Sequence, residues 1–418
     1  MGSLLLFLAA VSSLLAPPRT QLISQRCSLP RCGPPHPAQC SSEPPELSCV
    51  LQAAGVASSP ERVTQLTSGF CNAVYLVEMA REQQIGGERI VVVKLFSPLA
   101  KLRLSPAERG MGDLSASDAG LGPRVLFRCE DGLITHYMDG MRDLTEMEVH
   151  AAGSDRLICA IATRLAKLHS LPLRDQISLG DSPSVALTDD PIALWRFMAR
   201  MLERIDRAPE SLPPGISVVE IRGAVDRMRR CVDALDLPVI YGHGDLKPSN
   251  VMSSADDTQV QFIDFELAGA HYRGYDLHKI FRTGLPATEA SQKNIDLFLK
   301  AYMSALRGAG SLKHNGAASP AIQGFVATEQ MGPTLEELQG EAAASEPLTW
   351  LEAAVFFWFA TVEYPSQANE WGPLALDRWN NYLATAHKIE EGGVAAVMLE
   401  RARRQRRGKG TIATSSVD

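Results

Sequence analysis

A stretch between residues 239 and 266 gathers side chains of types that can hold a metal ion and handle a proton. It contains Asp245, then Asn250 five residues later, and then Asp264. Carboxylate and amide oxygens are hard ligands suited to Mg²⁺, so Asn250 and Asp264 form a candidate metal site. Asp245 is a second carboxylate, able to accept a hydrogen bond from an attacking hydroxyl group and to orient that group.

The order of these residues is that of a known chemical pattern, His-x-Asp-x-x-x-x-Asn followed by Ile-Asp-Phe. Apolar runs at 239–241 and 260–263 predict a strand before each half of the pattern, and Asp257-Thr258 predicts a turn between the halves. This hairpin would return the second half to the first. The pattern is typical of the catalytic loop and metal loop that kinase-like phosphotransferases use to move a γ-phosphoryl group.

A strand-rich region before this stretch supplies residues that could bind a nucleotide. The small-residue turn that contains Ser68, Gly69 and Asn72 could cover phosphates with backbone N–H groups, although a plain hairpin turn is the alternative. Lys94 ends a run of three valines and matches the strand lysine that holds the α- and β-phosphates. Glu108, in the helical stretch that follows, is a candidate ion-pair partner for Lys94.

The composition is that of an ordinary globular protein of 418 residues and excludes a collagen, a coiled coil and a mainly disordered chain. With 41 Lys and Arg against 48 Asp and Glu, the net charge of −7 argues against a dedicated nucleic-acid binder. The longest apolar stretches are too short for a membrane span, so we expect none.

Hydrophobic periodicity predicts an α+β fold in which strands come first and helices follow. Strands are expected at 74–78, 90–96, 125–127 and 133–138, and helices at 157–168, 192–206, 218–235, 348–359 and 375–386. We expect a leader at 1–60, a nucleotide-binding lobe at 61–140, a catalytic and acceptor-binding lobe at 141–400 and a solvated basic tail at 401–418. A loose insertion is expected at 308–346 within the larger lobe.

The expected leader differs from the rest of the chain. An apolar stretch at 4–16 is followed by a segment that contains arginine and serine but no acidic residue before Glu43. This composition is typical of a targeting peptide, and an extension without an address is the alternative. The leader also holds the cysteines at 27, 32, 40 and 49, whose wide spacing favours unpaired thiols over a zinc site.

The chain resembles the choline/ethanolamine kinase family, within the wider aminoglycoside-phosphotransferase-like kinases, over residues 65–385. The resemblance is carried by the segments LTSGFCNAVYLVE, VVVKLF, GLGP and LAKLH. It is most specific in IDFELAGAHYRGYDLHKIF, after the second motif. Aminoglycoside phosphotransferases generally lack the Tyr-Arg-Gly-Tyr-Asp run at 272–276, so this run favours the choline/ethanolamine branch.

The resemblance implies a bilobal protein-kinase-like fold with a small antiparallel-sheet N-lobe and a larger, mainly helical C-lobe. It implies ATP, Mg²⁺ and the phosphorylation of choline or ethanolamine, the first step of phosphatidylcholine and phosphatidylethanolamine synthesis. By position, Asp245 would be the catalytic base, Asn250 and Asp264 metal ligands, and Glu266 a second-metal or water-mediated ligand. His136 and Met138 lie in the expected hinge beside the nucleotide.

The resemblance also implies a cytoplasmic enzyme, with organelle targeting or secretory entry through the leader as the alternative. A homodimer is a further expectation, and nucleic acid is not expected as a partner.

The acceptor site is the part in which the chain departs from the family pattern. The family has an acidic residue two positions after a phenylalanine, but here Phe281 is followed by Arg282-Thr283. The candidate acceptor contacts are Tyr272, Arg273, Trp358 and Trp371. An internal ion pair between Arg273 and Asp276 is the favoured alternative for that arginine. Aromatic residues at helical spacing, such as Trp358, are more often part of a core.

Two other functions remain open from the residues alone. The missing carboxylate near Thr283 leaves room for a kinase of another hydroxyl compound, similar to aminoglycoside phosphotransferases. A catalytically silent nucleotide-binding protein is the other alternative. It predicts damage to the catalytic set, and the sequence shows none.

Overall fold

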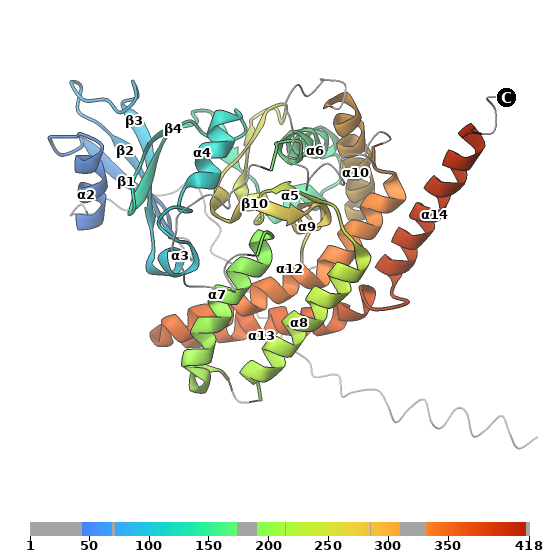
Figure 1. Ribbon diagram of the computed structural model, residues 1–418. Helices are drawn as coiled ribbons and strands as arrows, with labels where there is room; N and C mark the ends of the chain where they lie inside the picture. The colour runs from blue at the N-terminus through green and yellow to red at the C-terminus, as the bar shows by residue number, and fades with distance from the viewer. Residues whose placement is uncertain are drawn as a thin grey trace, which may run out of the picture. The chain divides into compact units, whose positions relative to one another are not determined.

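The computed structural model describes residues 44–68, 72–173, 190–213, 215–284, 286–309 and 332–414. The first part of this chain forms a five-stranded antiparallel sheet, drawn in blue to cyan in Figure 1. In spatial order the strands are β1 (Arg62–Ser68), β2 (Asn72–Glu78), β3 (Ile90–Phe96), β5 (Gly132–His136) and β4 (Val125–Arg128). The expected strands at 74–78 and 90–96 are confirmed. Lys94 lies on the central strand, opposite Val74 and Leu133.

A helix that was not expected packs on this sheet. Helix α2 (Pro45–Ala53) begins with a proline, which suits the first turn of a helix because no backbone N–H is needed there. Its residues Leu47, Val50 and Leu51 are buried in one hydrophobic cluster with residues of β2, β3 and β5. The expected boundary at residue 60 is therefore wrong, because the packed structure includes residues 45–53.

The rest of the expected leader cannot be compared with the structure. Residues 1–43, with the apolar stretch and Cys27, Cys32 and Cys40, lie outside the described residues. Cys49 is exposed on α2 and is a free thiol. Targeting by this segment stays a prediction.

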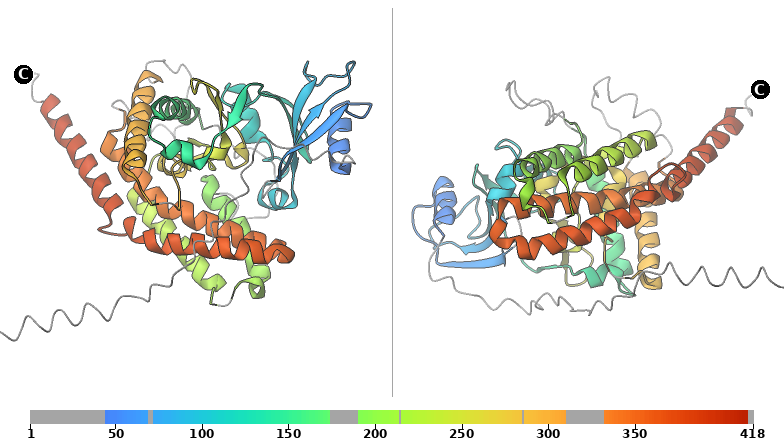
Figure 2. Two further views of the ribbon diagram at one scale, coloured as in Figure 1. Left: turned by 180° about the vertical axis from the view of Figure 1, so that it is seen from behind. Right: turned by 90° about the horizontal axis from the view of Figure 1, so that it is seen from below.

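The second part of the chain is mainly helical, so the expected α+β architecture with a small sheet lobe and a larger helical lobe is confirmed. Figure 2 shows α12 and α13 side by side, with α7 and α8 packed against α12. The helices of this lobe are α5 (Glu146–His150), α6 (Asp155–His169), α7 (Ala193–Arg207), α8 (Val218–Leu235), α9 (Arg273–Lys279), α10 (Glu289–Ala309), α12 (Leu335–Glu363), α13 (Ala368–Thr385) and α14 (Val394–Thr414). All five helical stretches expected from periodicity are helical, and those at 192–206 and 375–386 extend one residue beyond α7 and α13.

The two motif segments lie on short strands and turns between the lobes. Strand β7 (Val239–Gly242) pairs with β10 (Gly269–Tyr272), and β8 (Val251–Ser254) pairs with β6 (Met141–Asp143) and β9 (Val260–Phe262). The 3₁₀ turn η2 (Pro248–Asn250) ends the first motif, and η3 (Phe265–Leu267) begins at the last residue of the second. The expected hairpin is confirmed, since Val251 pairs with Phe262 and so places Asn250 beside Asp264.

Two short helices connect the sheet to the motif segments. Helix α3 (Pro98–Arg103) begins at Ser97, whose Oγ accepts a hydrogen bond of 3.2 Å from the backbone N–H of Ala100. Helix α4 (Met111–Asp118) follows and contacts η3. The sequence indicated a poor helix here because of Gly110 and Gly112. The structure uses Gly110 as a left-handed N-cap, with φ of 71°.

Two late segments differ from expectation. The expected loose insertion at 308–346 is wrong at its end, because α12 begins at Leu335 with a capping box between Thr334 and Glu337. Residues 310–331 lie outside the described residues. The expected solvated basic tail begins within helix α14, where the side chains of Arg401 and Arg404 are exposed, as expected, but Arg406 forms an ion pair of 2.7 Å with Glu337.

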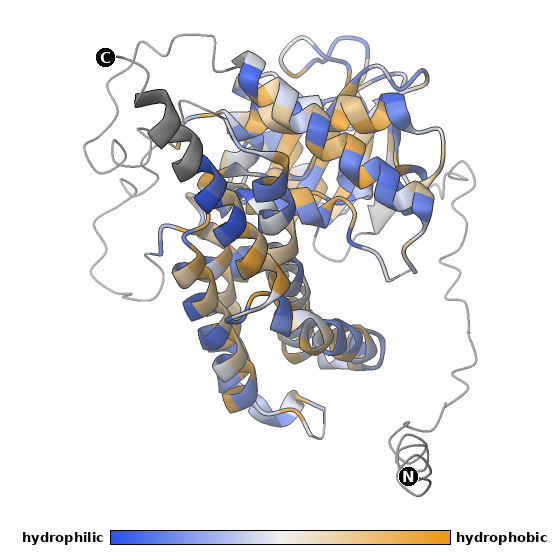
Figure 3. Ribbon diagram, turned by 90° about the vertical axis from the view of Figure 1, so that its right-hand side faces the viewer, coloured by the Kyte–Doolittle hydropathy of each residue, from blue (hydrophilic) through white to orange (hydrophobic). Residues whose placement is uncertain are grey.

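In the described part of the chain, no helix is long and apolar enough to cross a membrane. Figure 3 shows hydrophilic residues interspersed along the helices.

Candidate active site

The loop that carries Asp245 is fixed by a buried carboxylate from α9. Asp276 is 1 % exposed, and one of its oxygens accepts a hydrogen bond of 2.6 Å from the backbone N–H of His243. Its other oxygen accepts one of 3.0 Å from Gly244, and the ring of His169 lies 3.1 Å away. Burial alone would raise the pKa of Asp276, but the hydrogen bond from His169 and the charges of His169, His243 and His271 lower it to about 2. The ionised carboxylate of Asp276 therefore holds the loop in place.

Asp245 lies between two lysines. Its Oδ2 is 3.0 Å from Nζ of Lys247, and its Oδ1 is 3.0 Å from Nζ of Lys279. Asn250 donates through Nδ2 to the backbone oxygen of Asp245 at 2.8 Å and to its carboxylate at 3.2 Å. Burial would raise the pKa of Asp245, but the two ammonium groups hold it well below its usual range. Asp245 is thus an ionised carboxylate, ready to accept a hydrogen bond.

The two motifs are joined through their backbones. The ring of His243 is fully buried, and its Nε2 donates to the carbonyl of Ile263 at 3.0 Å. The N–H of Ile263 donates to the carbonyl of Asn250, also at 3.0 Å. Asp264, the next residue, has φ of 64° and lies in the left-handed region, which is uncommon for a residue other than glycine. Such strained positions persist where the surroundings enforce them, often at functional sites.

Lys94 reaches the second motif from the sheet. Its Nζ lies 2.6 Å from Asp264 and 4.0 Å from Asp113 on α4. Burial would lower the pKa of Lys94, but the nearby carboxylates of Asp113, Asp264 and Glu266 raise it, so the side chain stays charged. The same lysine charge lowers the pKa of Asp264 against the effect of burial.

The expected pairing of Lys94 with Glu108 is wrong. Glu108 lies after α3, and its carboxylate pairs with Arg200 at 2.7 Å and with Arg196 at 3.2 Å, both on α7. Besides Asp264, the carboxylate that lies near Lys94 is that of Asp113. The sequence did not reveal Asp113 as a site residue because Gly110 and Gly112 lower the helix propensity of its segment. Like Glu108, Asp113 follows the strand that carries Lys94.

Gly112 explains how Asp113 comes this close. A Cβ atom added at Gly112 would lie 2.1 Å from the carbonyl oxygen of Phe265 on η3. Only glycine therefore lets α4 approach the turn that follows Asp264. The residue that weakens the helical pattern is the one that positions the helix.

Glu266 is held by residues from the small lobe. Asn72 donates to one of its oxygens at 2.7 Å, and Arg103 forms an ion pair with the other. Burial and the negative charge of Asp264 raise the pKa of Glu266, against the lowering effect of the Arg103 and Lys94 charges.

The other expected nucleotide contacts have mixed outcomes. Asn72 contacts Glu266 and accepts a hydrogen bond of 3.1 Å from the N–H of Ser97, so it stabilises the junction between the lobes. Gly69 and the side chain of Ser68 lie outside the described residues. His136 ends β5 and accepts a hydrogen bond of 2.7 Å from the N–H of Arg124, and Met138 follows it half-buried. A nucleotide-binding role for these residues stays a prediction.

The side chains expected to contact the acceptor have other partners. Arg273 pairs with Glu341 on α12 through two hydrogen bonds of 2.7 and 2.8 Å. The favoured alternative is thus right that this arginine fixes the fold, but its partner is Glu341 and not Asp276. Tyr272 is buried, and its hydroxyl accepts a hydrogen bond of 2.8 Å from Trp195.

The two tryptophans proposed for the acceptor belong to the core. Trp358 is fully buried on α12, with its ring centre 5.1 Å from that of Trp379. Trp371 is buried on α13 and packs edge-on against Tyr364. Both lie in the largest hydrophobic cluster, which favours the alternative that they are core residues, and their contact with an acceptor stays a prediction.

A carboxylate from α12 occupies the neighbourhood of Asp245 instead. Glu352 lies 3.3 Å from Nζ of Lys279, the lysine that also contacts Asp245. Thr283 stands where the family has an acid, and Glu352 brings an acid to the site from a distant helix. Neither Lys279 nor Glu352 was expected as a site residue. Sequence offers one weak signal for Lys279, which is its place in the segment 263–281 that resembles the family most specifically.

The oxygen donors of the site fit a small divalent cation. Both contacts of the Asn250 amide nitrogen are acceptors, so its oxygen points away from Asp245. Asp264 lies on the strand hairpin beside it. Among the described residues no group of three or more His, Cys, Asp or Glu is arranged to hold a metal alone. A site with few protein ligands suits Mg²⁺, which usually keeps waters and binds substrate phosphates.

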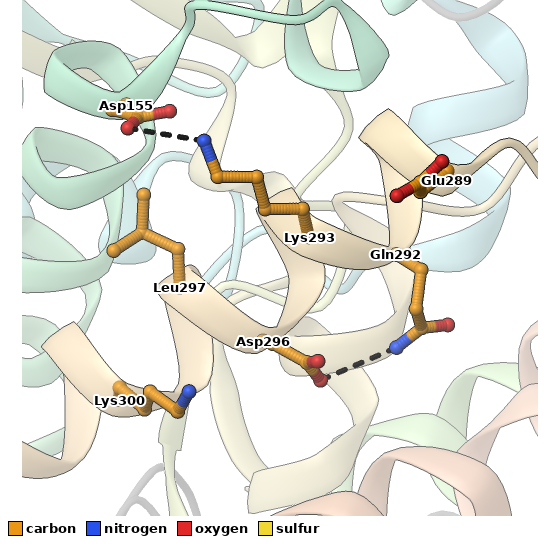
Figure 4. Close-up of a pocket in the computed structure, with 7 residues that line it drawn as sticks. All are labelled: Asp155, Glu289, Gln292, Lys293, Asp296, Leu297 and Lys300. Atoms are coloured by element: carbon orange, nitrogen blue, oxygen red, sulfur yellow. Dashed lines mark hydrogen bonds and ion pairs between the residues drawn. The ribbon is translucent and has the colours of Figure 1, made fainter.

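A surface hollow elsewhere has no residue in common with this site. It lies along α10 opposite the start of α6 (Figure 4). Lys293 points toward Asp155 there, and Gln292 toward Asp296, so its polar side chains largely satisfy each other. We assign no chemistry to it.

Comparison with known proteins places these features in one family. The family model described as Choline/ethanolamine kinase matches residues 63–307, more than half of the chain. A mouse protein named Choline/ethanolamine kinase is 24% identical over 227 residues, which are 52% of this chain and 54% of that protein. Human Ethanolamine kinase 2 is 26% identical over 222 residues, 53% of this chain and 52% of that one. The chain thus spans about half the length of these relatives.

Solved structures show the same fold. The ethanolamine kinase of Plasmodium vivax aligns with a TM-score of 0.58 at 14% identity, covering 81% of this chain and 86% of that one. The choline kinase LicA of Streptococcus pneumoniae aligns with a TM-score of 0.52 at 15% identity, covering 81% and 97%. The matched segment 63–307 contains both motifs and Lys94. The chain therefore belongs to the choline/ethanolamine kinase family.

Proposed function

We propose that this protein transfers the γ-phosphoryl group of ATP to the hydroxyl of a small amino alcohol, choline or ethanolamine, and forms its phosphomonoester. The observation that carries the proposal is the cluster of Lys94, Asp245, Asn250 and Asp264 at the junction of the two lobes. Family membership supports the reaction class, and the relatives are named as choline and ethanolamine kinases. A structure of LicA in complex with AMP supports an adenine nucleotide as the donor.

The roles follow from the chemistry of each side chain. Asp245 would accept a hydrogen bond from the acceptor hydroxyl and take its proton as the new P–O bond forms. Lys94 would bind nucleotide phosphate oxygens, since it is a charged ammonium at the edge of the site. Asn250 and Asp264 would hold Mg²⁺, with Glu266 as a further ligand, and the ion would neutralise phosphate charge.

The main task of the protein in this reaction is to position the two reactants. Phosphoryl transfer depends on aligning the hydroxyl with the γ-phosphorus and on stabilising charge on the phosphate oxygens. Asp276 and His243 hold the catalytic loop to the metal loop through the backbone contacts described above. The lysine pair around Asp245 keeps its carboxylate ionised, which a base needs before it can take a proton.

A second acceptor class is favoured by a specific observation. Trp358 and Trp371 are core residues, and Thr283 replaces the family acid. These features leave a neutral or larger hydroxyl compound as the alternative acceptor. The silent nucleotide-binding alternative has no such support, because the base and candidate metal ligands are brought together.

The test is ADP release by the purified full chain with ATP, Mg²⁺ and one alcohol at a time. We expect turnover with choline or ethanolamine that exceeds turnover with sugars and aminoglycosides. Stronger turnover with a sugar or an aminoglycoside would select the alternative acceptor class. Binding of Mg·ATP with no ADP release from any acceptor would restore the silent alternative.

A further inference from the structure

Lys279 is a buried cation inside the candidate acceptor site. Its side chain is 2 % exposed, and its Nζ lies 3.0 Å from Asp245 and 3.3 Å from Glu352. The same Nζ lies 3.4 Å from the carbonyl of Gly244 and 5.3 Å from the ring centre of Tyr275. A buried ammonium is costly unless carboxylates and dipoles surround it, and here both do.

The other lysine beside Asp245 is held differently. The side chain of Lys247 is 43 % exposed, whereas Lys279 and Glu352 are almost completely buried. An exposed ammonium on a flexible stem can move toward a phosphate at little cost. Lys279 has no such freedom, because its buried ammonium is held by the carboxylates of both Asp245 and Glu352.

The position of Lys279 is fixed by close contact between α9 and α12. A Cβ atom added at Gly274 would lie 2.1 Å from the carbonyl of Glu341, so the two helices touch at their backbones. The Arg273–Glu341 pair lies beside this contact, and Arg282 donates to the carbonyl of Thr349 at 2.5 Å. The ammonium is therefore held by a rigid helix pair.

We propose that Lys279 is a built-in cation of the acceptor site and sets the selectivity of the protein for acceptor charge. The proposal rests on the proposed function, because it takes Asp245 as the residue that receives the acceptor hydroxyl. Two carbon atoms separate hydroxyl and nitrogen in choline and ethanolamine, so the nitrogen must lie close to Asp245. There it meets Lys279, which already neutralises Glu352.

The charges around Asp245 determine how strongly the site favours a positively charged acceptor over a neutral one. Asp245 and Glu352 carry two negative charges, and Lys279 cancels one of them before any acceptor binds. Lys247 and Arg282 oppose the second. A positive charge on the acceptor therefore gains little here, and an uncharged alcohol of the same shape loses little. Selectivity is a difference between two affinities, and Lys279 reduces that difference.

The experiment compares choline with its uncharged isostere, 3,3-dimethyl-1-butanol, by kcat/KM for ADP release. The ratio is kcat/KM for choline divided by kcat/KM for the neutral alcohol. In the wild type the two values should differ by less than about tenfold, because a positive charge on the acceptor adds little to its binding. Lys279→Met removes the cation and should raise the ratio in favour of choline by at least about tenfold. The double variant Lys279→Met with Glu352→Gln should return the ratio toward wild type. Lys300→Met, an exposed lysine on α10, is the matched control and should not change the ratio.

If Lys279 had only a structural role, Lys279→Met would lower kcat/KM for both alcohols by the same factor. An unchanged ratio in Lys279→Met, with equal losses of kcat/KM for both alcohols, would overturn the proposal. Should that variant not fold in a thermal melt, Glu352→Gln decides the question with the opposite sign. It removes one of the two carboxylates that contact the lysine, so the ratio should fall at least about tenfold in favour of the neutral alcohol. No fall would equally overturn it.

Failure of the proposed function is a separate outcome. It would appear as no ADP release from the wild type with any alcohol. Calorimetric titration of choline into wild type and Lys279→Met, without ATP, then tests Lys279 by itself. Choline binding at least about tenfold tighter to the variant would support the built-in cation, and equal affinity would contradict it.

Discussion

The carboxylate of Asp276 holds the catalytic loop in place by accepting hydrogen bonds from the backbone N–H groups of His243 and Gly244. It never needs to touch a substrate for this, so it is a positioning residue. The sequence identified Asp276 within the Tyr-Arg-Gly-Tyr-Asp run but assigned it the wrong partner. Local spacing favoured Arg273, three residues away, whereas the partners lie directly after β7 and on α6.

The pKa of Asp276 predicts how its contribution to stability depends on pH. The pKa is about 2 in the fold against an ordinary 3.8, so the ionised group stabilises the protein above about pH 4. This stabilisation is lost as the pH falls through about 2, since the proton is then bound in both states. Asp276→Asn should lower the free energy of unfolding near pH 7 by about 2 kcal/mol, because one pKa unit corresponds to about 1.4 kcal/mol.

Urea titrations at a series of pH values check this. The difference between wild type and Asp276→Asn should shrink from about pH 4 downward. The exposed Asp226→Asn on α8 is the control and should show no such dependence. A difference that grows in acid would show that the sign is wrong.

At the scale of elements, α4 and η3 form the contact that brings the small lobe to the metal loop. Gly112 allows it, and Asp113 and Lys94 then lie on either side of the same junction. Helix α12 has a comparable role in the large lobe. Its residues Glu341, Glu352 and Phe356 contact Arg273, Lys279 and Arg103, respectively, along one face of the helix.

Gly112→Ala tests the first contact. The added methyl group would overlap the carbonyl of Phe265, so α4 must move, and we expect a loss of about 1–3 kcal/mol in stability. The kcat/KM for ATP should fall as well, because Asp113 moves away from Lys94. Gly223→Ala, in the open interior of α8, is the matched control. It should be neutral or stabilise by up to about 1 kcal/mol, since alanine favours helices. Equal effects of the two changes would refute the role of close approach.

On the scale of the whole molecule, the folded unit includes α2 as part of the small lobe. Leu47 is fully buried between this helix and the sheet. Leu47→Ala should lower the free energy of unfolding by about 2–5 kcal/mol, as large-to-small changes in a core do. Gln52→Ala on the exposed side of α2 is the control, expected to be nearly neutral. A small loss at Leu47 in denaturant titrations would mean that the helix is not integral to the lobe.

Much of this architecture could be predicted from sequence because it depends on local pattern. The strands around Lys94 and the hairpin between Asn250 and Asp264 follow from β-branched runs and turn residues. The pairings that failed depend on distant elements. Glu352 lies more than one hundred residues after Asp245 in the chain, and no spacing rule connects them. Asp113 was hidden because glycine lowers helix propensity, whereas here close packing requires it.

The compartment, the homodimer and the nucleotide contacts of His136 and Met138 stay predictions. They depend on residues outside the described chain or on partners that contact it.

The most direct test of the central claim is the appearance of the phosphomonoester itself. Phosphorus NMR of wild type with ATP, Mg²⁺ and choline or ethanolamine should show the product signal rising in step with ADP. Asp245→Asn should form it about a hundred to ten thousand times more slowly, because the base is lost, while Mg·ATP still binds. No phosphomonoester from either alcohol, or an Asp245→Asn variant as fast as wild type, would contradict the assignment of Asp245 as the base of an amino-alcohol kinase.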